Sequence, residues 1–208
     1  MVFAIVVVVL AGYLLGNLNG AVCMSNLLAH EDVRQKGSGN AGLTNFIRVY
    51  GATSGLAVIL IDGGKTVLAC FIGGLILVPY GMYPEGMAIG AIAVMIGHDF
   101  PALLGFKGGK GILSGAVIAL TLDWRIGVLG LGVFLIAYLL TGYVSLGSIL
   151  GAVTFAVGFV IFQHSHPTVM ICGVVMGSLA VFMHRGNIVR LLHGNERRTN
   201  LFGKGEKA

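Results

Sequence analysis

Three polar segments interrupt an otherwise apolar chain of 208 residues, and each carries residue types that bind phosphate. The first runs from Arg34 to Arg48 and combines glycines with hydroxyl, amide and guanidinium side chains. Glycine-rich turns expose backbone N–H groups that form anion-binding concavities, and arginine adds a fixed positive charge. Its candidate binding residues are Ser38, Gly39, Asn40, Gly42, Thr44, Asn45 and Arg48.

The first segment has two other interpretations. Residues Gly37 to Gly42 match the dinucleotide-binding fingerprint, which also needs a preceding strand and a βαβ unit. No strand pattern precedes them, so a nucleotide site is disfavoured. A flexible glycine turn would explain the glycines but not Ser38, Asn40 and Arg48 together, and we therefore favour phosphate binding.

The second segment runs from Gly97 to Gly111 and holds two lysines separated by two glycines. Lysine charges beside a helix N-terminus suit a second anion, although the same lysines could simply mark membrane topology. The segment lacks the Ser or Thr of a Walker loop, so ATP is not expected. We interpret His98 as a structural donor, with a general base as the alternative. The candidate residues are His98, Lys107, Gly108, Gly109, Lys110 and Gly111.

The third segment begins at His184, and its His184, Asn187 and Arg190 recur every three residues. In a helix these three side chains share one face, and the leucines beside them indicate an amphipathic helix along the membrane surface. A purely basic membrane anchor would explain the arginines but not His184, Asn187 or Glu196. His184, Asn187 and Glu196 are therefore the candidate site residues of this segment.

The elements that must position these segments are membrane helices. The chain is 56% hydrophobic and only 10% charged, whereas soluble domains average about 25% charged residues. Small residues let membrane helices approach closely, so the 34 glycines indicate tight helix packing. Cys23, Cys70 and Cys172 lie in apolar stretches and are interpreted as reduced thiols. No metal-ligand cluster is visible, so we expect no metal or cofactor, and activity that is insensitive to chelators.

Apolar stretches predict an all-α integral membrane bundle of seven transmembrane helices in a single domain, residues 1–208. The predicted spans are 2–28, 52–79, 86–104, 111–122, 126–141, 145–163 and 168–184. Residues 111–122 are too few to cross a membrane unless that helix extends or the segment is re-entrant. The alternative is six spans, with the fourth and fifth merged around Asp123, Trp124 and Arg125. Asp62 and Lys65, three apart in the second span, are interpreted as a structural pair.

The distribution of basic residues predicts the orientation, because positive loops stay in the cytoplasm. With seven spans, one side of the membrane receives Arg34, Lys36, Arg48, Lys107, Lys110, Arg185, Arg190, Arg197, Arg198, Lys204 and Lys207. The other side receives only Arg125. This places the N-terminus outside, the C-terminus in the cytoplasm and all three polar segments on the cytoplasmic side.

The three segments resemble the motifs of the bacterial acyl-phosphate:glycerol-3-phosphate acyltransferases. The matching strings are Gly37-Ser-Gly-Asn-x-Gly-x-Thr-Asn-x-x-Arg48, Gly97-His-x-x-Pro-x-x-Leu-x-Phe-Lys-Gly-Gly-Lys-Gly111 and His184-x-x-Asn-Ile-x-Arg-Leu-Leu-x-Gly-x-Glu196. The resemblance covers essentially the whole chain. It implies a multi-pass enzyme of the bacterial inner (plasma) membrane that transfers an acyl chain from acyl phosphate to glycerol 3-phosphate. The products would be 1-acylglycerol 3-phosphate (lysophosphatidate) and phosphate, in the first step of phospholipid synthesis.

By matching positions, the resemblance implies substrate-binding or catalytic roles for the polar candidates of all three segments, and we assign catalytic roles to Ser38, Lys107, His184 and Asn187. The chain departs from the family in the first span, where Asn17-Leu-Asn19-Gly20 replaces a Ser-x-Pro-x-Gly pattern. Smaller departures are Leu43 and the stretch Ile112 to Ser114. These put first-span packing and substrate preference in question, but not the reaction.

Our hypothesis is that Ser38, Gly39, Asn40 and the Lys107/Lys110 loop hold acyl phosphate, and that Arg48, His184 and Asn187 orient glycerol 3-phosphate. The opposite assignment is equally open. The expected partners are these two substrates and membrane lipids, with no nucleic acid, and we expect a monomer. The competing class is a small transporter or channel for an anionic metabolite, but transporters place their polar groups near the membrane midplane, often in repeated halves.

Overall fold

The computed structural model describes residues 1–199. Within that range the chain forms ten α-helices and three short 3₁₀ helices, without strands. The α-helices are α1 (Val2–Asn17), α2 (Gly20–Ala29), α3 (Leu43–Tyr50), α4 (Ala52–Leu77), α5 (Tyr83–Asp99), α6 (Ile112–Leu122), α7 (Trp124–Thr141), α8 (Val144–Phe162), α9 (Pro167–Met183) and α10 (Arg185–Leu192). The 3₁₀ helices are η1 (Val33–Gln35), η2 (Val78–Tyr80) and η3 (Ala102–Leu104).

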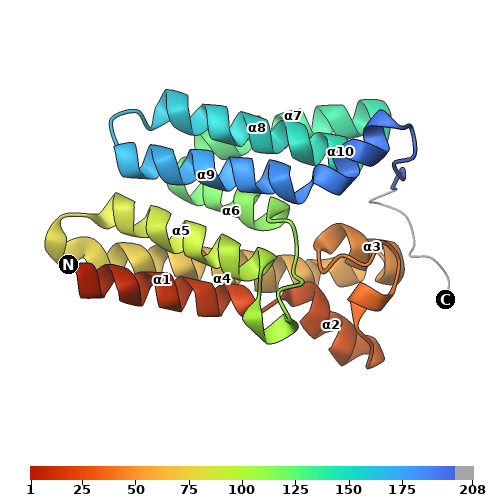
Figure 1. Cartoon of the computed structure of the whole chain (residues 1–208), viewed down its shortest axis with the longest axis horizontal. Coiled ribbons are helices and arrows are strands. Elements are labelled where there is room, and N and C mark those ends of the chain that lie inside the picture. The colour runs from red at the N-terminus through yellow and green to blue at the C-terminus, as the bar shows by residue number, and fades with distance from the viewer. Residues whose placement is uncertain (200–208) are drawn as a thin grey trace.

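The long helices form two packed groups, which meet through contacts of α5 with α9 and through α6. Helices α1, α4 and α5 contact one another, α8 packs against both α7 and α9, and α6 contacts members of both groups. The short helices α2, α3 and α10 lie at one end of the bundle, while the N-terminus lies at the other end (Figure 1). The absence of strands confirms, for residues 1–199, that the glycines of the first segment do not belong to a nucleotide-binding βαβ unit.

Glycines set the spacing of the first helix group. A Cβ placed on Gly73 of α4 would lie 2.2 Å from the carbonyl oxygen of Gly86 on α5, and one placed on Gly16 of α1 would lie 2.4 Å from the carbonyl oxygen of Val94. Real Cβ atoms are not found that close to backbone atoms, so only glycine permits these approaches. The tight packing predicted from the glycine content is confirmed here.

Five described helical segments are long and apolar enough to cross a membrane, and a sixth is obtained if α9 and α10, bent by 52°, count as one. These helices confirm a multi-span helical architecture. Helix α6 has only 11 residues, so it is roughly 16 Å long and shorter than the hydrocarbon core. Seven crossings are therefore not established by helix length.

The merged fourth and fifth spans of the six-span alternative do not form. Asp123 ends α6 and caps α7, accepting the backbone N–H of Arg125 at 3.1 Å. Helix α7 then turns back along α6, and a Cβ on Gly127 would lie 2.5 Å from the side chain of Leu120. An aspartate that caps a helix at this junction explains why the two segments remain separate helices.

The predicted first span, residues 2–28, corresponds to one apolar stretch, Val2–Ala29, that is long enough to cross a membrane but is divided into the two helices α1 and α2. The chain leaves the helical conformation at Leu18 and Asn19, and Asn19 caps α2 by accepting the backbone N–H of Val22 at 3.0 Å. Its amide also donates to the carbonyl of Ala41 at 2.9 Å. Asparagine side chains compete with helix hydrogen bonds and favour caps, which explains the break. The break ties the first span to the first polar segment.

Candidate active site

All three polar segments line one cavity of about 1030 Å³ at the end of the bundle where α2, α3 and α10 lie. We call this space the polar cavity. Every candidate site residue from the sequence analysis lines it: Ser38, Gly39, Asn40, Gly42, Thr44, Asn45, Arg48, His98, Lys107, Gly108, Gly109, Lys110, Gly111, His184, Asn187 and Glu196. The prediction that these distant segments converge is therefore met by the geometry. Lys204 and Lys207, which contributed to the predicted orientation, lie outside the described residues.

Asn45 organises the first segment. Its amide nitrogen donates at 3.1 Å to each of the carbonyls of Val33, Lys36 and Asn40, and its oxygen accepts the backbone N–H of Ser38 at 2.7 Å. The side chain is only 2% exposed. With its amide fully used inside the loop, we infer that Asn45 shapes the loop rather than contacting a substrate directly.

Positive φ angles give this loop its curvature. Gly37 and Gly39 have φ angles of 59° and 75°, a conformation that glycine adopts without steric cost. A Cβ on Gly37 would also lie 2.3 Å from the side-chain oxygen of Asn45. Ser38 and Gly39 are exposed, but the backbone N–H of Ser38 donates to Asn45 and that of Gly39 donates to the carbonyl of Lys36 at 3.0 Å, so the loop offers a ligand the hydroxyl of Ser38.

Arg34 joins the first segment to the second, a role that the sequence analysis did not assign. It pairs with Asp32 at 2.7 Å, and its Nη1 donates to the carbonyls of Leu104 at 2.8 Å and Lys107 at 3.1 Å. Asp32 hydrogen-bonds the guanidinium and raises the pKa of Arg34 above its ordinary value. The Arg34 guanidinium therefore holds the loop around Lys107 in place against the first polar segment.

The lysine loop of the second segment lies directly on the end of α5. Gly109 and Gly108 donate their backbone N–H groups to the carbonyls of His98 at 3.0 Å and Asp99 at 3.2 Å. A Cβ on Gly108 would lie 2.0 Å from the carbonyl oxygen of His98, and one on Gly109 would lie 2.1 Å from its Nε2. The two glycines between the lysines are therefore required by backbone proximity.

A buried charged cluster lies beneath the lysine loop. Lys65 forms an ion pair with Asp62 at 2.8 Å, and Lys65 Nζ lies 3.0 Å from His98 Nδ1. Asp62 also accepts the backbone N–H of Gly20 at 3.0 Å. The geometry supports the interpretation of Asp62 and Lys65 as a structural pair. Nδ1 of His98 accepts a hydrogen bond from the lysine ammonium, so in the neutral ring the proton lies on Nε2, which remains a donor.

Asp99 is a buried residue to which the sequence analysis gave no role in the site. It lines the polar cavity, is 1% exposed, and neither carboxylate oxygen has a hydrogen-bond partner within residues 1–199. A Cβ on Gly111 would lie 3.3 Å from both oxygens. Gly111 thus leaves room for this carboxylate at the start of α6.

Lys110, Asn187 and Glu196 connect the second segment to the third. Lys110 donates to the amide oxygen of Asn187, whose nitrogen donates to Glu196 at 2.8 Å. Glu196 also accepts from Arg190 at 2.8 Å. Burial, followed by the nearby charge of Arg190, lowers the pKa of Lys110 below its ordinary value of 10.5. Burial opposes the ionisation of Glu196, but hydrogen bonds from Asn187 and Arg190 outweigh it and lower the pKa of Glu196.

His184 lies at the bend between α9 and α10 and is 4% exposed. Its Nδ1 lies 2.8 Å from the carbonyl oxygen of Ala180, and since a carbonyl can only accept, Nδ1 carries a proton in this contact. In the neutral ring Nε2 then keeps its lone pair. Arg48 of α3 donates to Thr199 at 2.6 Å, so the chain after α10 closes one side of the polar cavity.

The arrangement suits a ligand set with two negative groups. Lys107, Lys110 and Arg48 bring positive charge into one cavity, beside the N-terminal end of α6. Such groups bind phosphate and stabilise negative charge that develops in a reaction. The fold and the cavity together define a membrane-embedded helical protein with a polar anion-binding site at one end of its bundle.

Comparisons with known proteins identify the family. A family model described as glycerol-3-phosphate acyltransferase matches residues 6–194. The glycerol-3-phosphate acyltransferase of Thermoanaerobacter sp. is 40% identical over 194 residues, covering 93% of this chain and 94% of that protein. The protein of the same description from Finegoldia magna is 37% identical, covering 88% and 90%. The chain therefore belongs to the glycerol-3-phosphate acyltransferase family, and the resemblance of its motifs is confirmed.

Solved structures agree with this assignment. The crystal structure of PlsY (YgiH), an integral membrane glycerol 3-phosphate acyltransferase, in its glycerol 3-phosphate form matches with a TM-score of 0.82 at 29% identity, covering 94% of this chain and 96% of that one. Its lysophosphatidic acid form matches with a TM-score of 0.81 at 28% identity, covering 95% and 96%. The chain is thus an integral membrane enzyme of the acyltransferase class.

Proposed function

We propose that the protein transfers an acyl chain from acyl phosphate to the sn-1 hydroxyl of glycerol 3-phosphate. The products are 1-acylglycerol 3-phosphate and inorganic phosphate. The observation that carries the proposal is the convergence of all three polar segments on one cavity at the end of the bundle. Relatives described as glycerol-3-phosphate acyltransferases support the acceptor, as do the glycerol 3-phosphate and lysophosphatidic acid forms of the solved neighbour.

Acyl phosphate is the donor that best fits the cavity. It is an activated acyl group, because phosphate is a good leaving group, so no covalent nucleophile on the enzyme is needed. Two anionic substrates repel each other, and several fixed positive charges with backbone donors offset that repulsion. Lys107, Lys110 and Arg48 supply the charges around one space, and the N-terminal end of α6 supplies backbone N–H donors.

The reaction balances without a cofactor. The sn-1 hydroxyl oxygen attacks the acyl carbonyl carbon, the carbon–oxygen bond to phosphate breaks, and phosphate leaves with the bonding electrons. A substrate phosphate oxygen takes the hydroxyl proton, and backbone N–H groups or a lysine stabilise the charge on the carbonyl oxygen. Substrate-assisted proton removal is consistent with the contact that His184 Nδ1 makes with a backbone carbonyl, which fits a role in positioning.

The roles of individual residues follow from their contacts. Ser38, Gly39 and Asn40 hold one phosphate together with Lys107 and Lys110. The other phosphate is oriented by Arg48, His184 and Asn187. Asn187 is the link between the two groups, because it joins Lys110 to Glu196. A change at Asn187 therefore affects both substrates.

The proposal includes a topology. We place the polar cavity on the cytoplasmic side of the bacterial inner membrane, with the N-terminus outside, the C-terminus inside, and α6 as the short fourth of seven spans. The unequal distribution of basic residues between the two sides of the membrane supports this orientation. The position of α3 and α10 at the end of the bundle opposite the N-terminus supports it as well (Figure 1). We propose that a monomer is active, because every residue assigned to the site belongs to one chain.

One assay tests the reaction. The purified full chain in detergent is incubated with acyl phosphate and glycerol 3-phosphate, and lysophosphatidate and phosphate are quantified. Formation of both products in equal amounts supports the proposal. Absence of lysophosphatidate from folded protein contradicts it and would favour transport of an anionic metabolite, which needs two compartments and yields no product in detergent.

A further inference from the structure

The two histidines that line the polar cavity, His98 and His184, carry their ring protons on different nitrogens. Nδ1 of His184 lies 2.8 Å from the carbonyl oxygen of Ala180, so this nitrogen carries the proton. Nδ1 of His98 lies 3.0 Å from Nζ of Lys65. Because an ammonium group can only donate, this nitrogen carries the lone pair and Nε2 carries the proton. Nε2 is therefore an acceptor in His184 and a donor in His98.

Lys65 of α4 determines where the proton of His98 lies. It is the one hydrogen-bond partner of Nδ1 in the described part of the chain. The other polar groups around the ammonium are acceptors: the carbonyl oxygens of Gly16 and Leu18 and the Asp62 carboxylate, which lies 3.7 Å from Nδ1. Without the ammonium, these acceptors would favour a proton on Nδ1.

The contact with His98 exceeds what Lys65 itself needs. Its ammonium has three N–H groups, and the Asp62 carboxylate at 2.8 Å with the carbonyls of Gly16 and Leu18 already provides three acceptors. His98 is a fourth acceptor for the same three donors. Lys65 would thus be satisfied without His98, whereas Nδ1 of His98 has no other donor within residues 1–199.

Nε2 of His98 lies beside the lysine loop and is open to a ligand. It has no hydrogen-bond partner among residues 1–199, and it is not fully enclosed as the two carboxylate oxygens of Asp99 are. A Cβ on Gly109 would overlap this nitrogen, and Gly109 stands between Lys107 and Lys110 in the sequence. The N–H group of the ring therefore lies against the loop that carries both lysines.

We propose that Lys65, held by Asp62, is a positioning residue for acyl transfer. It keeps the proton of His98 on Nε2, and this N–H donates to the phosphate of acyl phosphate bound at the lysine loop. The inference rests on the proposed acyl transfer and deepens it by giving the buried pair a role in the reaction. The leaving phosphate gains negative charge as its bond to the acyl carbon breaks, and a donor already in place stabilises that charge.

The proton positions are tested by ¹⁵N NMR of the full chain, labelled at histidine, in detergent without substrates. Ring-nitrogen shifts distinguish the two neutral forms, and His98→Gln and His184→Gln assign the signals. In the wild type His98 is expected to carry its proton on Nε2 and His184 on Nδ1. Lys65→Met should move the proton of His98 to Nδ1 and leave His184 unchanged. The control is Thr66→Val, because Thr66 is fully buried beside Lys65 but does not line the polar cavity.

Steady-state kinetics tests the consequence for the reaction. Lys65→Met should lower kcat/KM for acyl phosphate by about 10- to 100-fold, the worth of one hydrogen bond to a charged group. The KM for glycerol 3-phosphate should stay near the wild-type value, as should all constants of Thr66→Val. A purely structural role of Lys65 predicts a lower Tm and a smaller active fraction, with the proton of His98 still on Nε2.

If Lys65→Met does not fold, as judged by its Tm, the variant Asp62→Asn/Lys65→Met takes its place, because it leaves no unpaired buried charge. A further pair leaves Lys65 intact: His98→Gln puts an amide near the position of Nε2 and His98→Asn puts one near that of Nδ1. His98→Gln should keep more activity with acyl phosphate than His98→Asn.

Three results overturn the inference: a wild-type His98 with its proton on Nδ1, an unchanged His98 signal without Lys65, or a shifted proton with wild-type kcat/KM for acyl phosphate. Equal activity of His98→Gln and His98→Asn also counts against it. The NMR measurement needs no turnover, so it is separate from the reaction. A wild type that makes no lysophosphatidate refutes the proposed function, whereas a wrong proton position refutes only the role of Lys65.

Discussion

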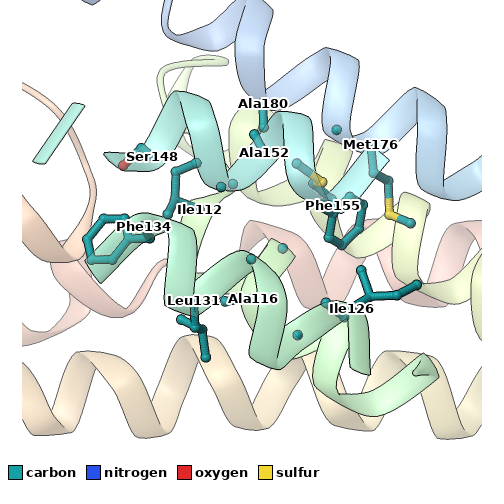
Figure 2. A pocket seen from close by; sticks show the side chains of 18 residues that line it. Ile112, Ala116, Ile126, Leu131, Phe134, Ser148, Ala152, Phe155, Met176 and Ala180 are labelled. Atoms are coloured by element: carbon teal, nitrogen blue, oxygen red, sulfur yellow. The ribbon is translucent and has the colours of Figure 1, made fainter. Parts of the chain in front are cut away.

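The polar cavity and a smaller apolar pocket of about 60 Å³, which lies among α6, α7, α8 and α9 (Figure 2), both include Gly111 in their lining, yet they are built in opposite ways. Around the polar cavity, backbones and side chains approach so closely that a Cβ on Gly109 would lie 2.1 Å from His98. In the apolar pocket, six residues further on, a Cβ on Gly115 would meet no atom within 4 Å. The polar cavity is fixed by contacts, whereas the apolar pocket keeps free space beside its helices. A small addition beside the polar cavity should therefore impair the reaction more than the same addition beside the apolar pocket.

The largest effect is expected for Lys110→Met. This change removes a charge from the polar cavity and its hydrogen bond to Asn187, and loss of one preorganised donor in an active site lowers turnover by about 10²- to 10³-fold. Steady-state kinetics with both substrates measures the loss. Gly132→Val, which lies outside both spaces, is the control for folding. If Lys110→Met keeps the wild-type kcat/KM, then Lys110 takes no part in the reaction.

A nearly comparable loss is expected for Gly109→Ala. The added methyl group cannot coexist with the ring of His98, so the lysine loop must shift, and a displacement of about 1 Å in an active site costs roughly a hundredfold in rate. Gly132→Ala adds the same methyl group where no atom lies within 4 Å and should keep its activity. Equal activity of the two variants would show that the polar cavity tolerates movement as well as the apolar region does.

A smaller and more selective effect is expected for His184→Ala. If a substrate phosphate removes the hydroxyl proton, His184 only positions the acceptor, so KM for glycerol 3-phosphate should rise by about tenfold while kcat stays near the wild-type value. Initial rates at saturating and limiting acceptor separate the two constants. A near-complete loss of kcat at saturation would instead make His184 the general base.

The smallest effect is a change in pH dependence. Burial and the charge of Arg190 lower the pKa of Lys110 below 10.5, so this lysine loses its positive charge at a lower pH than an exposed lysine does. The alkaline fall in kcat/KM, which reports the free enzyme, should therefore begin below pH 10.5. Lys110→Arg keeps its charge throughout this range and should move the fall to higher pH. The same alkaline profile in both proteins would exclude Lys110 as its cause.

The sequence was sufficient to predict which residues line the polar cavity, because residue type and the pattern of basic loops carry that information. Glycines, lysines and amides that share one side of the membrane have few uses other than binding anions. All three segments do line one cavity. The multi-span helical fold followed from apolar content in the same way.

The finer geometry depends on contacts between residues far apart in the chain. The break at Asn19 depends on its cap and on the carbonyl of Ala41, and the signal for it was present in the Asn17-Leu-Asn19-Gly20 departure. The bridge made by Arg34 and the loop-shaping role of Asn45 required knowledge of which carbonyls lie beside them. The apolar pocket arises from four helices and has no local motif.

The central claim, that the three polar segments form one site at the inner edge of the membrane, is tested most directly by accessibility from each side. Single cysteines replace Lys107, Leu192 and Trp124, which are exposed, in a chain whose Cys23, Cys70 and Cys172 have been replaced. Each is labelled with a membrane-impermeant thiol reagent from either face. The proposed topology predicts that positions 107 and 192 react from the cytoplasm and position 124 from the opposite face. Labelling of positions 107 and 192 from opposite faces would contradict it.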